Sequence, residues 1–268
     1  MEEEMTFGEK LAVVRKAEGL TQAELAEQVG VSNEAVSKWE SGRYSPEPEK
    51  MARLEEVLHW NWYDEKGELL SGRIFDEEQM SAFLKGKFAS GRFPEAQKAL
   101  PYAKEQHQST KPRKGPGNVP YISHPLTLTC HALAMGLEDD ILLAALLLHD
   151  VTEDCGIPPA EMPVCEEVQE IVALVSKPEK KDYHARKYFD AIAENPRACM
   201  VKCIDRCNNL GTMAVAFPRE KMIEYIEETE TWYPRLLKII KGEPAYNNAA
   251  WLLSYQIGCT LQTVKSFL

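Results

Sequence analysis

Residues 137–154 read LEDDILLAALLLHDVTED, and this stretch decides the fold of the larger part of the chain. The run from Ile141 to Leu148 has no polar face, which is typical of a helix buried on every side. It ends in four ionisable residues: His149, Asp150, Glu153 and Asp154. Because buried charge is costly unless it is neutralised, this cluster favours a bound metal ion. An exposed acidic helix end is the alternative, but acidic groups at a C-terminal turn oppose the helix dipole.

Helical patterns continue on both sides of this stretch, and no convincing alternating strand occurs. The predicted fold class is therefore all-α, with a small helix-turn-helix domain followed by a larger multi-helical domain. Within one helix from 139 to 154, His149 with Glu153, and Asp150 with Asp154, would form i,i+4 pairs on adjoining faces. The helices predicted after residue 76 span 77–87, 95–107, 125–135, 139–154, 165–176, 182–193, 196–209, 219–232 and a stretch from 246.

The chain of 268 residues is long enough for one full-sized domain and one small domain. We predict a first domain at 1–60, a linker at 61–78 and a second domain at 79–268. The net charge of −11 argues against a surface that coats nucleic acid generally. No signal peptide or membrane-spanning run is recognisable, and the seven cysteines include no CxxC pair. Reduced thiols and a cytoplasmic location are expected.

Residues 6–58 are divided into short helices by visible capping signals. Thr6 to Glu9 and Thr21 to Glu24 each fit the capping-box pattern of a helix start. Glycines stand at 19, 30 and 42, where helices would end, and Ser32 can cap a third helix. Two helices joined by a tight glycine turn are the helix-turn-helix pattern.

The segment LTQAELAEQVGVSNEAVSKWESGRYSP, residues 20–46, closely resembles the Cro/Xre-type DNA-binding domain of phage repressors. The resemblance implies DNA contacts from the start of the second helix, from the third helix in the major groove, and from a cation near the following phosphates. The implied residues are Gln22, Asn33, Glu34, Lys38 and Arg43. Residues 1–60 hold seven basic and thirteen acidic residues, however, so a protein-binding role for this module stays open. Repressors of this type bind as dimers, which makes a homodimer possible.

Three segments of the second domain carry residues suited to one site. A Gly/Pro-rich loop, KPRKGPGNVPYISHP at 111–125, ends at His124, and Pro125 suits the first position of a helix. The second segment is HDVTED, and the third is NPRACMVKCIDRCNNLGT at 195–212. In the third, Asp205, Asn209 and Thr212 share one helical stripe, whereas the cysteines at 203 and 207 fall on the opposite side. Packing in the hydrophobic core explains these cysteines better than coordination of a zinc ion does.

Two imidazoles and two carboxylates would come from His124, His149, Asp150 and Asp205. This mixture without thiolate suits six-coordinate Mn²⁺ or Fe²⁺, and such a metal makes a water reactive near neutral pH. Glu153 and Asp154 would orient that water and handle its proton, while Arg113 and Lys114 would clamp an anionic substrate. His131 could compete as a ligand, although a core or supporting histidine explains it more simply.

The H…HD…D order resembles the HD superfamily of metal-dependent phosphohydrolases. More narrowly, RKGPGNVPYISHP, ALLLHDVTED and VKCIDRCNNLGTM resemble the hydrolase domain of RelA/SpoT enzymes, which remove the 3′-pyrophosphate of ppGpp with Mn²⁺. The long loop before His124 is similar to that of small stand-alone alarmone hydrolases. The resemblance implies the same four metal ligands and catalytic roles for Glu153 and Asp154. It also implies nucleotide contacts from Arg113, Lys114, Asn209 and Thr212.

The chain departs from this family at Asn208, where an aromatic residue or His is usual, and at Gly211, where a basic residue is usual. The nucleotide preference is therefore open, and another phosphorylated nucleotide is an alternative substrate. A transcriptional regulator whose HD domain senses a nucleotide without turnover is a further alternative. The presence of both Glu153 and Asp154 favours an enzyme, because a sensor needs neither.

Overall fold

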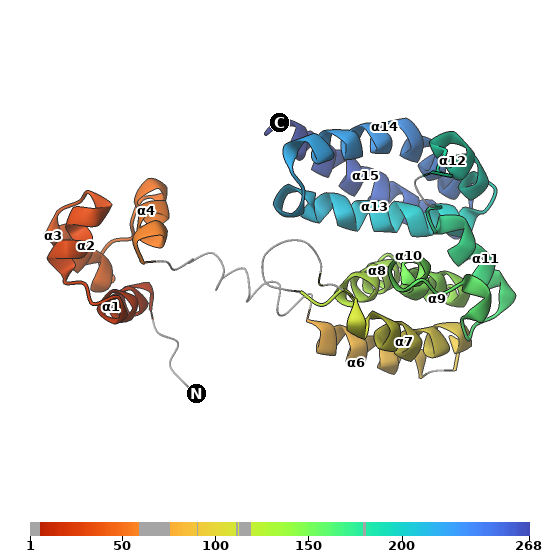
Figure 1. Cartoon of the computed structure of the whole chain (residues 1–268), viewed down its shortest axis with the longest axis horizontal. Coiled ribbons are helices and arrows are strands. Elements are labelled where there is room, and N and C mark those ends of the chain that lie inside the picture. Colours follow the sequence, from red (N-terminus) through yellow and green to blue (C-terminus); the bar gives the residue numbers. More distant parts are fainter. Residues whose placement is uncertain (1–5, 59–75, 90, 111, 113–118, 179–180) are drawn as a thin grey trace. The chain divides into compact units, whose positions relative to one another are not determined.

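The computed structural model describes residues 6–58, 76–89, 91–110, 112, 119–178 and 181–268 (Figure 1). The chain divides into two compact units, Met1–Ile74 and Phe75–Leu268. Most of the predicted linker, 61–78, lies outside the described residues. Its last residues are helical, because Asp76 caps a helix that begins at Glu77. No helix among the described residues has both the length and the apolar character needed to cross a membrane.

The first unit contains four described helices: α1 (Phe7–Ala17), α2 (Gln22–Val29), α3 (Asn33–Glu40) and α4 (Pro48–Leu58). The predicted capping boxes are confirmed, since the Thr6 and Thr21 hydroxyls accept from the backbone N–H of Glu9 and Glu24. Gly30 ends α2 in the left-handed region at φ 73°, a conformation that glycine adopts without a steric penalty. The turn between α2 and α3 is therefore encoded locally.

Helices α1 and α3 approach each other closely at Gly8. A Cβ atom at Gly8 would lie 2.3 Å from the carbonyl oxygen of Glu40 and 2.6 Å from that of Trp39. Both obstacles are backbone atoms, which cannot rotate away as a side chain can. Gly8 therefore permits the contact that closes this small core.

We expect Gly8→Ala to destabilise the first unit by about 1–3 kcal/mol, the usual cost of overpacking. The matched control is Gly86→Ala in α6, where an added Cβ meets nothing within 4 Å. That control should stabilise its helix by about 0.5–1 kcal/mol through helix propensity. Hydrogen–deuterium exchange of α1 to α3 measures the effect. Unchanged protection in Gly8→Ala would contradict the proposed steric limit.

All the regular secondary structure among the described residues of the second unit is helical, which confirms the all-α prediction. Its longer helices are α6 (Glu77–Phe88), α7 (Pro94–Gln106), α8 (Ser123–Ala134), α9 (Asp140–Leu148), α11 (Glu166–Val175), α12 (Ala185–Ala193), α13 (Pro196–Ala216), α14 (Arg219–Gly242) and α15 (Asn247–Lys265). Short helices fill the connections: η1 (His107–Ser109), α10 (Val151–Cys155) and η2 (Pro159–Glu161).

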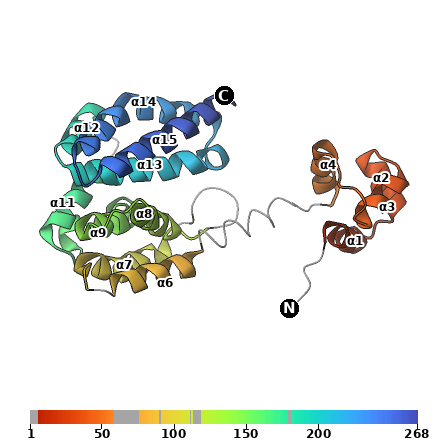
Figure 2. The same ribbon diagram turned by 180° about the vertical axis from the view of Figure 1, so that it is seen from behind.

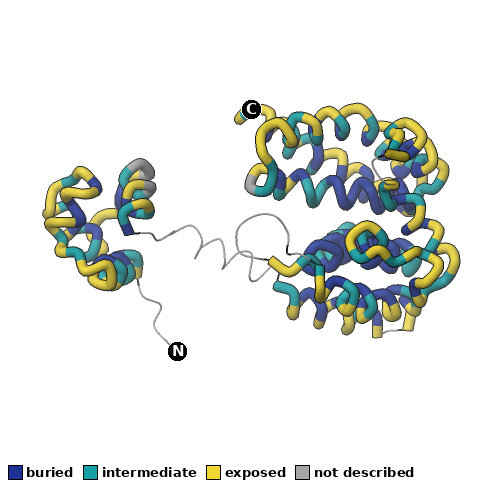
Figure 3. Tube along the Cα trace, viewed as in Figure 1, coloured by how far each residue is buried: buried dark blue, intermediate teal, exposed yellow. Residues whose placement is uncertain are grey.

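Two groups of helices form this unit, and the views in Figures 1 and 2 agree on their arrangement. Helices α6 to α10 make one group, α13 to α15 make the other, and α11 runs between them. Helix α13 contacts both α8 and α9 across the boundary. Figure 3 shows buried residues concentrated where these groups face each other. Many of the residues that meet at this boundary are thus shielded from water.

Helix α9 is the buried rod that its sequence predicts, since every residue from Leu142 to Leu148 is buried. The predicted single helix at 139–154 is wrong, however, because α9 ends at Leu148 and α10 starts at Val151. The imidazole Nδ1 of His149 donates to the carbonyl of Leu146 at 2.9 Å. That carbonyl is the acceptor that the N–H of Asp150 would use in a continuous helix. A side-chain hydrogen bond thus accompanies the break.

Candidate metal centre

The four predicted metal ligands come together where α8, α9 and α13 meet. His124 lies in the first turn of α8, His149 follows the end of α9, Asp150 precedes α10, and Asp205 lies within α13. The ligand atoms of His124, His149 and Asp205 all lie within 4.8 Å of one another. Because α8 begins at Ser123, Pro125 is the third helical residue rather than the first as predicted.

The carboxylates of Asp150 and Asp205 face the Nε2 atoms of both histidines. Asp150 Oδ2 lies 3.0 Å from Nε2 of His149 and 3.6 Å from Nε2 of His124. Asp205 Oδ1 lies 3.2 Å from Nε2 of His124 and 3.9 Å from Nε2 of His149. Each of the two imidazoles therefore has both carboxylates within 4 Å of its Nε2 atom.

Hydrogen bonds on the far side of each ring set the histidine tautomers. His149 Nδ1 donates to the Leu146 carbonyl, and His124 Nδ1 donates to Oδ1 of Asn208 at 2.9 Å. A ring that donates from Nδ1 can present the lone pair of Nε2 to a metal. Nε2 of His149 is buried and faces the carboxylates of Asp150 and Asp205. A buried imidazole nitrogen beside two carboxylates suits a ligand to a divalent cation.

The imidazoles and carboxylates of this cluster attract one another even without a cation. Burial opposes charge on His149, but the adjacent Asp150 carboxylate outweighs it and raises the pKa of His149 to about 9. Burial likewise disfavours charge on Asp150, yet His149 holds the pKa of that carboxyl well below its usual range. A metal must displace the imidazole proton, so metal affinity should fall as the pH drops below that value.

Lys202 supports Asp205 from the side away from the histidines. Its buried ammonium lies 3.3 Å from Oδ2 of Asp205, three residues further along α13. Burial disfavours charge on Asp205, but Lys202 keeps the pKa of that carboxyl well below its ordinary value. One oxygen of Asp205 is thereby fixed by Lys202, while the other faces the imidazoles.

Glu153 and Asp154 lie on the short helix α10, next to the four ligands. They occupy its first turn, so the sequence argument that they oppose a helix dipole does not hold. Oε1 of Glu153 accepts from the backbone N–H of Lys177 at 2.7 Å, which orients that carboxylate. Loss of water raises the pKa of Glu153, and it raises the pKa of Asp154 with a further contribution from Asp150. Both are exposed acids placed beside a buried charged cluster.

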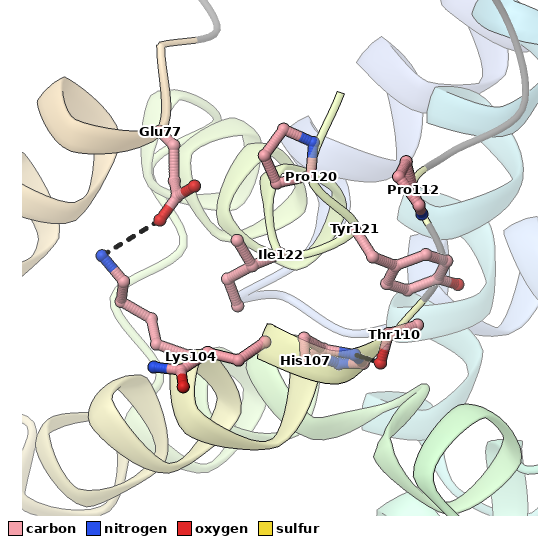
Figure 4. A pocket seen from close by; sticks show the side chains of 9 residues that line it. Glu77, Lys104, His107, Thr110, Pro112, Pro120, Tyr121 and Ile122 are labelled. Atoms are coloured by element: carbon pink, nitrogen blue, oxygen red, sulfur yellow. Dashed lines mark hydrogen bonds and ion pairs between the residues drawn. The ribbon is translucent and has the colours of Figure 1, made fainter. Parts of the chain in front are cut away.

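Tyr121 contacts the cluster of predicted metal ligands and also lines a neighbouring cavity. Its hydroxyl donates to Oδ2 of Asp150 at 2.7 Å, and its ring lies 5.0 Å from that of His107. Figure 4 shows the cavity, with the ion pair of Glu77 and Lys104 on the side away from Tyr121. Its volume is about 300 Å³. The described residues that line it are Glu77, Lys104, His107, Gln108, Thr110, Pro112, Pro120, Tyr121 and Ile122. None of the four predicted ligands lines this cavity.

The predicted substrate contacts are only partly described. Nδ2 of Asn209 donates to Oδ1 of Asp205 at 2.6 Å, and Thr212 lies one turn further along α13 on the same side. Both are half-buried near the cluster. Arg113 and Lys114 lie outside the described residues, so their predicted roles stay predictions.

The cysteines of α13 behave as packing residues. Cys199 and Cys203 are fully buried and Cys207 is half-buried, all three as free thiols. Burial raises the pKa of the Cys199 thiol to about 12 and that of Cys207 to about 11, so neither is a thiolate near neutral pH. His131, the other candidate ligand, is half-buried and does not belong to the described metal-ligating group.

Sequence reasoning missed three supporting residues: Tyr121, Lys202 and Asn208. Lys202 was recognisable, because a cation three residues before Asp205 can reach it on a helix. Asn208 departs from the residue usual in the family, yet it contacts His124, 84 positions away in the sequence. No local sequence pattern predicts a contact between residues so far apart in the chain.

We expect Asn208→Leu to weaken metal binding by about 10–100-fold, the usual effect of losing a supporting hydrogen bond to a metal ligand. The physical reason is that His124 Nδ1 loses an acceptor that fixes its tautomer. Asn208→Asp keeps an acceptor and is the matched control, expected to bind metal more tightly than the leucine variant. Calorimetric titration with Mn²⁺ measures both. Equal Mn²⁺ affinities of the Asn208→Leu and Asn208→Asp variants would contradict this role of Asn208.

The predicted DNA contacts of the first unit lie around α2 and α3. Asn33 and Arg43 are exposed, and Lys38 pairs with Glu34 at 2.8 Å. Gln22 donates from Nε2 to Glu40 at 2.7 Å, while Glu40 is also paired with the buried Arg15. Three of the five predicted residues thus have partners within the unit, which DNA would have to share or replace.

Comparison with known proteins gives two kinds of match. Residues 11–59 match the family model described as Helix-turn-helix. The chain is 35% identical over 150 residues to the guanosine-3′,5′-bis(diphosphate) 3′-pyrophosphohydrolase of Aquifex aeolicus (strain VF5), covering 53% of this chain and 21% of that protein. It is 33% identical over 150 residues to the GTP pyrophosphokinase rsh of Brucella melitensis biotype 1, covering 52% and 19%. The chain spans about a fifth of the length of these relatives.

A solved structure is described as a metazoan ortholog of SpoT that hydrolyzes ppGpp and plays a role in starvation responses. It matches with a TM-score of 0.50 and 22% identity, covering 63% of this chain and 95% of that one. This likeness shows a shared fold. Together with the relatives, it confirms the resemblance to RelA/SpoT-type proteins that the sequence motifs predict.

Proposed function

We propose that this protein is a metal-dependent phosphohydrolase that removes the 3′-pyrophosphate of ppGpp and carries a DNA-binding helix-turn-helix domain. The observation that carries the proposal is the grouping of the His124, His149 and Asp205 ligand atoms within 4.8 Å of one another, with Asp150 Oδ2 3.0 Å from Nε2 of the buried His149. The relatives named for this reaction and the shared fold support the choice of substrate.

A divalent cation, Mn²⁺ in this proposal, would be held by His124, His149, Asp150 and Asp205. Fe²⁺ or another divalent metal suits the same donors, because imidazole and carboxylate ligands without thiolate accept each of them. When bound, the metal supplies charge neutralisation at phosphate and a water of lowered pKa. Lys202 and Tyr121 keep the two carboxylates oriented towards the imidazoles.

The reaction in this proposal is hydrolysis at the 3′-substituent. The oxygen of water bonds to the phosphorus next to the 3′-oxygen, and the bond from that phosphorus to the 3′-oxygen breaks. Glu153 or Asp154 accepts the proton of the attacking water, and the 3′-oxygen leaves as a hydroxyl after gaining a proton. Arg113, Lys114, Asn209 and Thr212 would hold the nucleotide, with Arg113 contacting phosphate through two of its guanidinium nitrogens.

The decisive experiment offers ppGpp to the Mn²⁺-loaded protein and to an Asp150→Ala variant and follows products by chromatography. We expect pyrophosphate and GDP from the wild type and neither from the variant. A panel of other nucleotides, including 2′- and 3′-phosphorylated dinucleotides, tests the substrate. If the wild type releases no pyrophosphate or phosphate from any of these nucleotides, the proposed enzymatic activity is contradicted. If ppGpp still binds in that case, the result favours a nucleotide sensor. Equal turnover by Asp150→Ala would contradict the site.

The first unit is proposed to bind DNA with α3 in the major groove and with contacts from Gln22 at the start of α2, from Asn33, Glu34 and Lys38 on α3, and from Arg43 just after it. Asparagine can pair with adenine through two hydrogen bonds, and glutamate can accept from cytosine. The exposed positions of Asn33 and Arg43 support this role. Selection of DNA sequences by the full chain, followed by Asn33→Ala, is the direct test. Binding that is independent of sequence, or unchanged by Asn33→Ala, would contradict it.

We propose a cytoplasmic location. Its support is that all seven cysteines, including the exposed Cys259, are free thiols, as is usual in a reducing compartment.

A further inference from the structure

Lys177 contacts both groups of helices in the second unit. It lies two residues after the end of α11, the helix that runs between the groups (Figure 1). Its backbone N–H donates to Oε1 of Glu153 on α10 at 2.7 Å. Its ammonium lies 3.5 Å from Oε2 of Glu228 on α14. One residue therefore connects one of the two proposed proton acceptors to the opposite group of helices.

The Glu228 carboxylate is shared between two cations. Its Oε1 pairs with Nη2 of Arg206, while its Oε2 faces the ammonium of Lys177. Arg206 is buried on α13 and directly follows Asp205, one of the predicted metal ligands. A continuous series of contacts therefore joins α13, which carries a predicted metal ligand, to Glu153 on α10.

Burial and charge both keep the ammonium of Lys177 beside Glu228. The Lys177 side chain is only 35% exposed, and its Nζ lies 5.5 Å from the ring centre of Tyr183. Loss of water lowers the pKa of the ammonium, and the Glu228 carboxylate opposes that shift. Because a charge that is partly removed from water is costly without an opposite charge, the ammonium has a physical reason to stay at Glu228.

The backbone N–H of Lys177 can reach Glu153 because α11 ends before it. In a continuing helix this N–H would donate to the carbonyl of Ala173. Pro178 follows Lys177, and a proline disfavours the helical conformation in the residue before it. The N–H is thus left to donate to the Glu153 carboxylate. That bond uses Oε1 and leaves Oε2 to accept a proton.

We propose that Lys177 is a positioning residue for the proposed hydrolysis, because its ammonium at Glu228 fixes the segment whose N–H orients Glu153. This role rests on the proposed function, in which Glu153 takes a proton from the attacking water. A proton acceptor must lie within hydrogen-bond reach of that water, and a displacement of about 1 Å can cost about 100-fold in rate. Helix α10 has five residues, too few to be stable alone, so contacts from outside it must set the place of Glu153.

Lys177→Met removes the ammonium but keeps the backbone N–H and most of the side-chain length. With the Mn²⁺-loaded full chain and ppGpp, we expect kcat to fall by about 10–100-fold, with KM and Mn²⁺ affinity near those of the wild type. The acid limb of the kcat profile should move to higher pH, because a weakened N–H bond stabilises the charged Glu153 carboxylate less. Lys177→Arg keeps a cation for Glu228 and should restore most of the kcat.

Lys187→Met is the matched control, because Lys187 is exposed on α12, and it should leave kcat and KM unchanged. A Lys177→Met variant with the kcat of the wild type would overturn the positioning role. So would a Lys177→Arg variant that is as slow as Lys177→Met. A raised KM at unchanged kcat would also overturn it, since that result means that Lys177 contacts the substrate itself.

Amide hydrogen exchange tests the anchoring of Glu153 independently of catalysis. In the wild type the N–H of Lys177 should be protected by its bond to Glu153, and Lys177→Met should exchange faster at this position whether or not ppGpp is hydrolysed. If the wild type hydrolyses no nucleotide but exchange is faster in the variant, the proposed enzymatic function fails and the anchoring stands. Unchanged exchange in Lys177→Met would overturn the positioning role even in an active enzyme.

Discussion

Replacing Glu153 by Gln or Asp154 by Asn should lower the kcat for pyrophosphate release by about 10²–10⁴-fold, the usual contribution of a positioned acid or base. Both substitutions preserve size and hydrogen bonding while removing the ability to take a proton. Neither residue is among the four predicted metal ligands, so Mn²⁺ affinity should stay near that of the wild type. Single-turnover kinetics with ppGpp, beside calorimetric titration with Mn²⁺, measures the two properties separately.

The pH dependence of the same reaction provides a second test. Loss of water raises the pKa of both carboxyls, so each keeps its proton to a higher pH than a free carboxyl at about 4. A residue that must accept a proton is inactive while protonated. The acid limb of the kcat profile should therefore lie above the usual carboxyl range, and it should change in the variant that lacks the base. An unaltered rate and profile in both variants would contradict these roles.

Replacing Arg206 by Met should lower the free energy of unfolding of the second unit by about 3–5 kcal/mol, the cost of leaving a buried charge without its partner. Arg206 is buried, forms an ion pair with Glu228, and donates to Thr229 at 3.2 Å. Its guanidinium also lies 3.5 Å from the ring centre of Tyr225 and 4.5 Å from that of Tyr233. Methionine fills part of the volume but leaves the Glu228 carboxylate with only the longer contact to Lys177, at 3.5 Å.

Urea unfolding of the full chain measures this loss of stability, and hydrogen–deuterium exchange of α13 and α14 locates it. The matched control is Arg235→Met, which breaks an ion pair with Asp190 whose side chains are 50% and 51% exposed. Exposed pairs contribute at most about 1 kcal/mol, so this control should have little effect. Adding Glu228→Gln to Arg206→Met should recover part of the stability by removing the negative charge that Arg206 no longer neutralises. Equal costs for the Arg206 and Arg235 variants would contradict the argument.

Local sequence was sufficient wherever the interacting groups lie a few residues apart. The capping boxes at Thr6 and Thr21 use a residue three positions later, and Gly30 ends α2 through its own backbone conformation. Apolar spacing alone identified the buried helix α9. The candidate ligands were also recognisable, because imidazoles and carboxylates at the end of such a helix are rare without a purpose.

Contacts between distant segments were beyond these patterns. The break between α9 and α10 follows a competition for the Leu146 carbonyl, which helical spacing does not foresee. Asn208 meets His124 only because α13 packs against α8. The orientation of Asp205, held by Lys202 and by Asn209, likewise depends on which side of α13 becomes buried.

The residues and motifs alone determined an all-α chain with a helix-turn-helix unit and a charged cluster at the end of a buried rod, because helix caps and apolar periodicity act over three or four positions. Only the tertiary structure decided that the two Nε2 atoms converge on two carboxylates, and that Tyr121 and Asn208 hold them there. The reason is physical. The ligands lie far apart in sequence, so their distances follow from the packing of α8, α9 and α13 and not from any local rule.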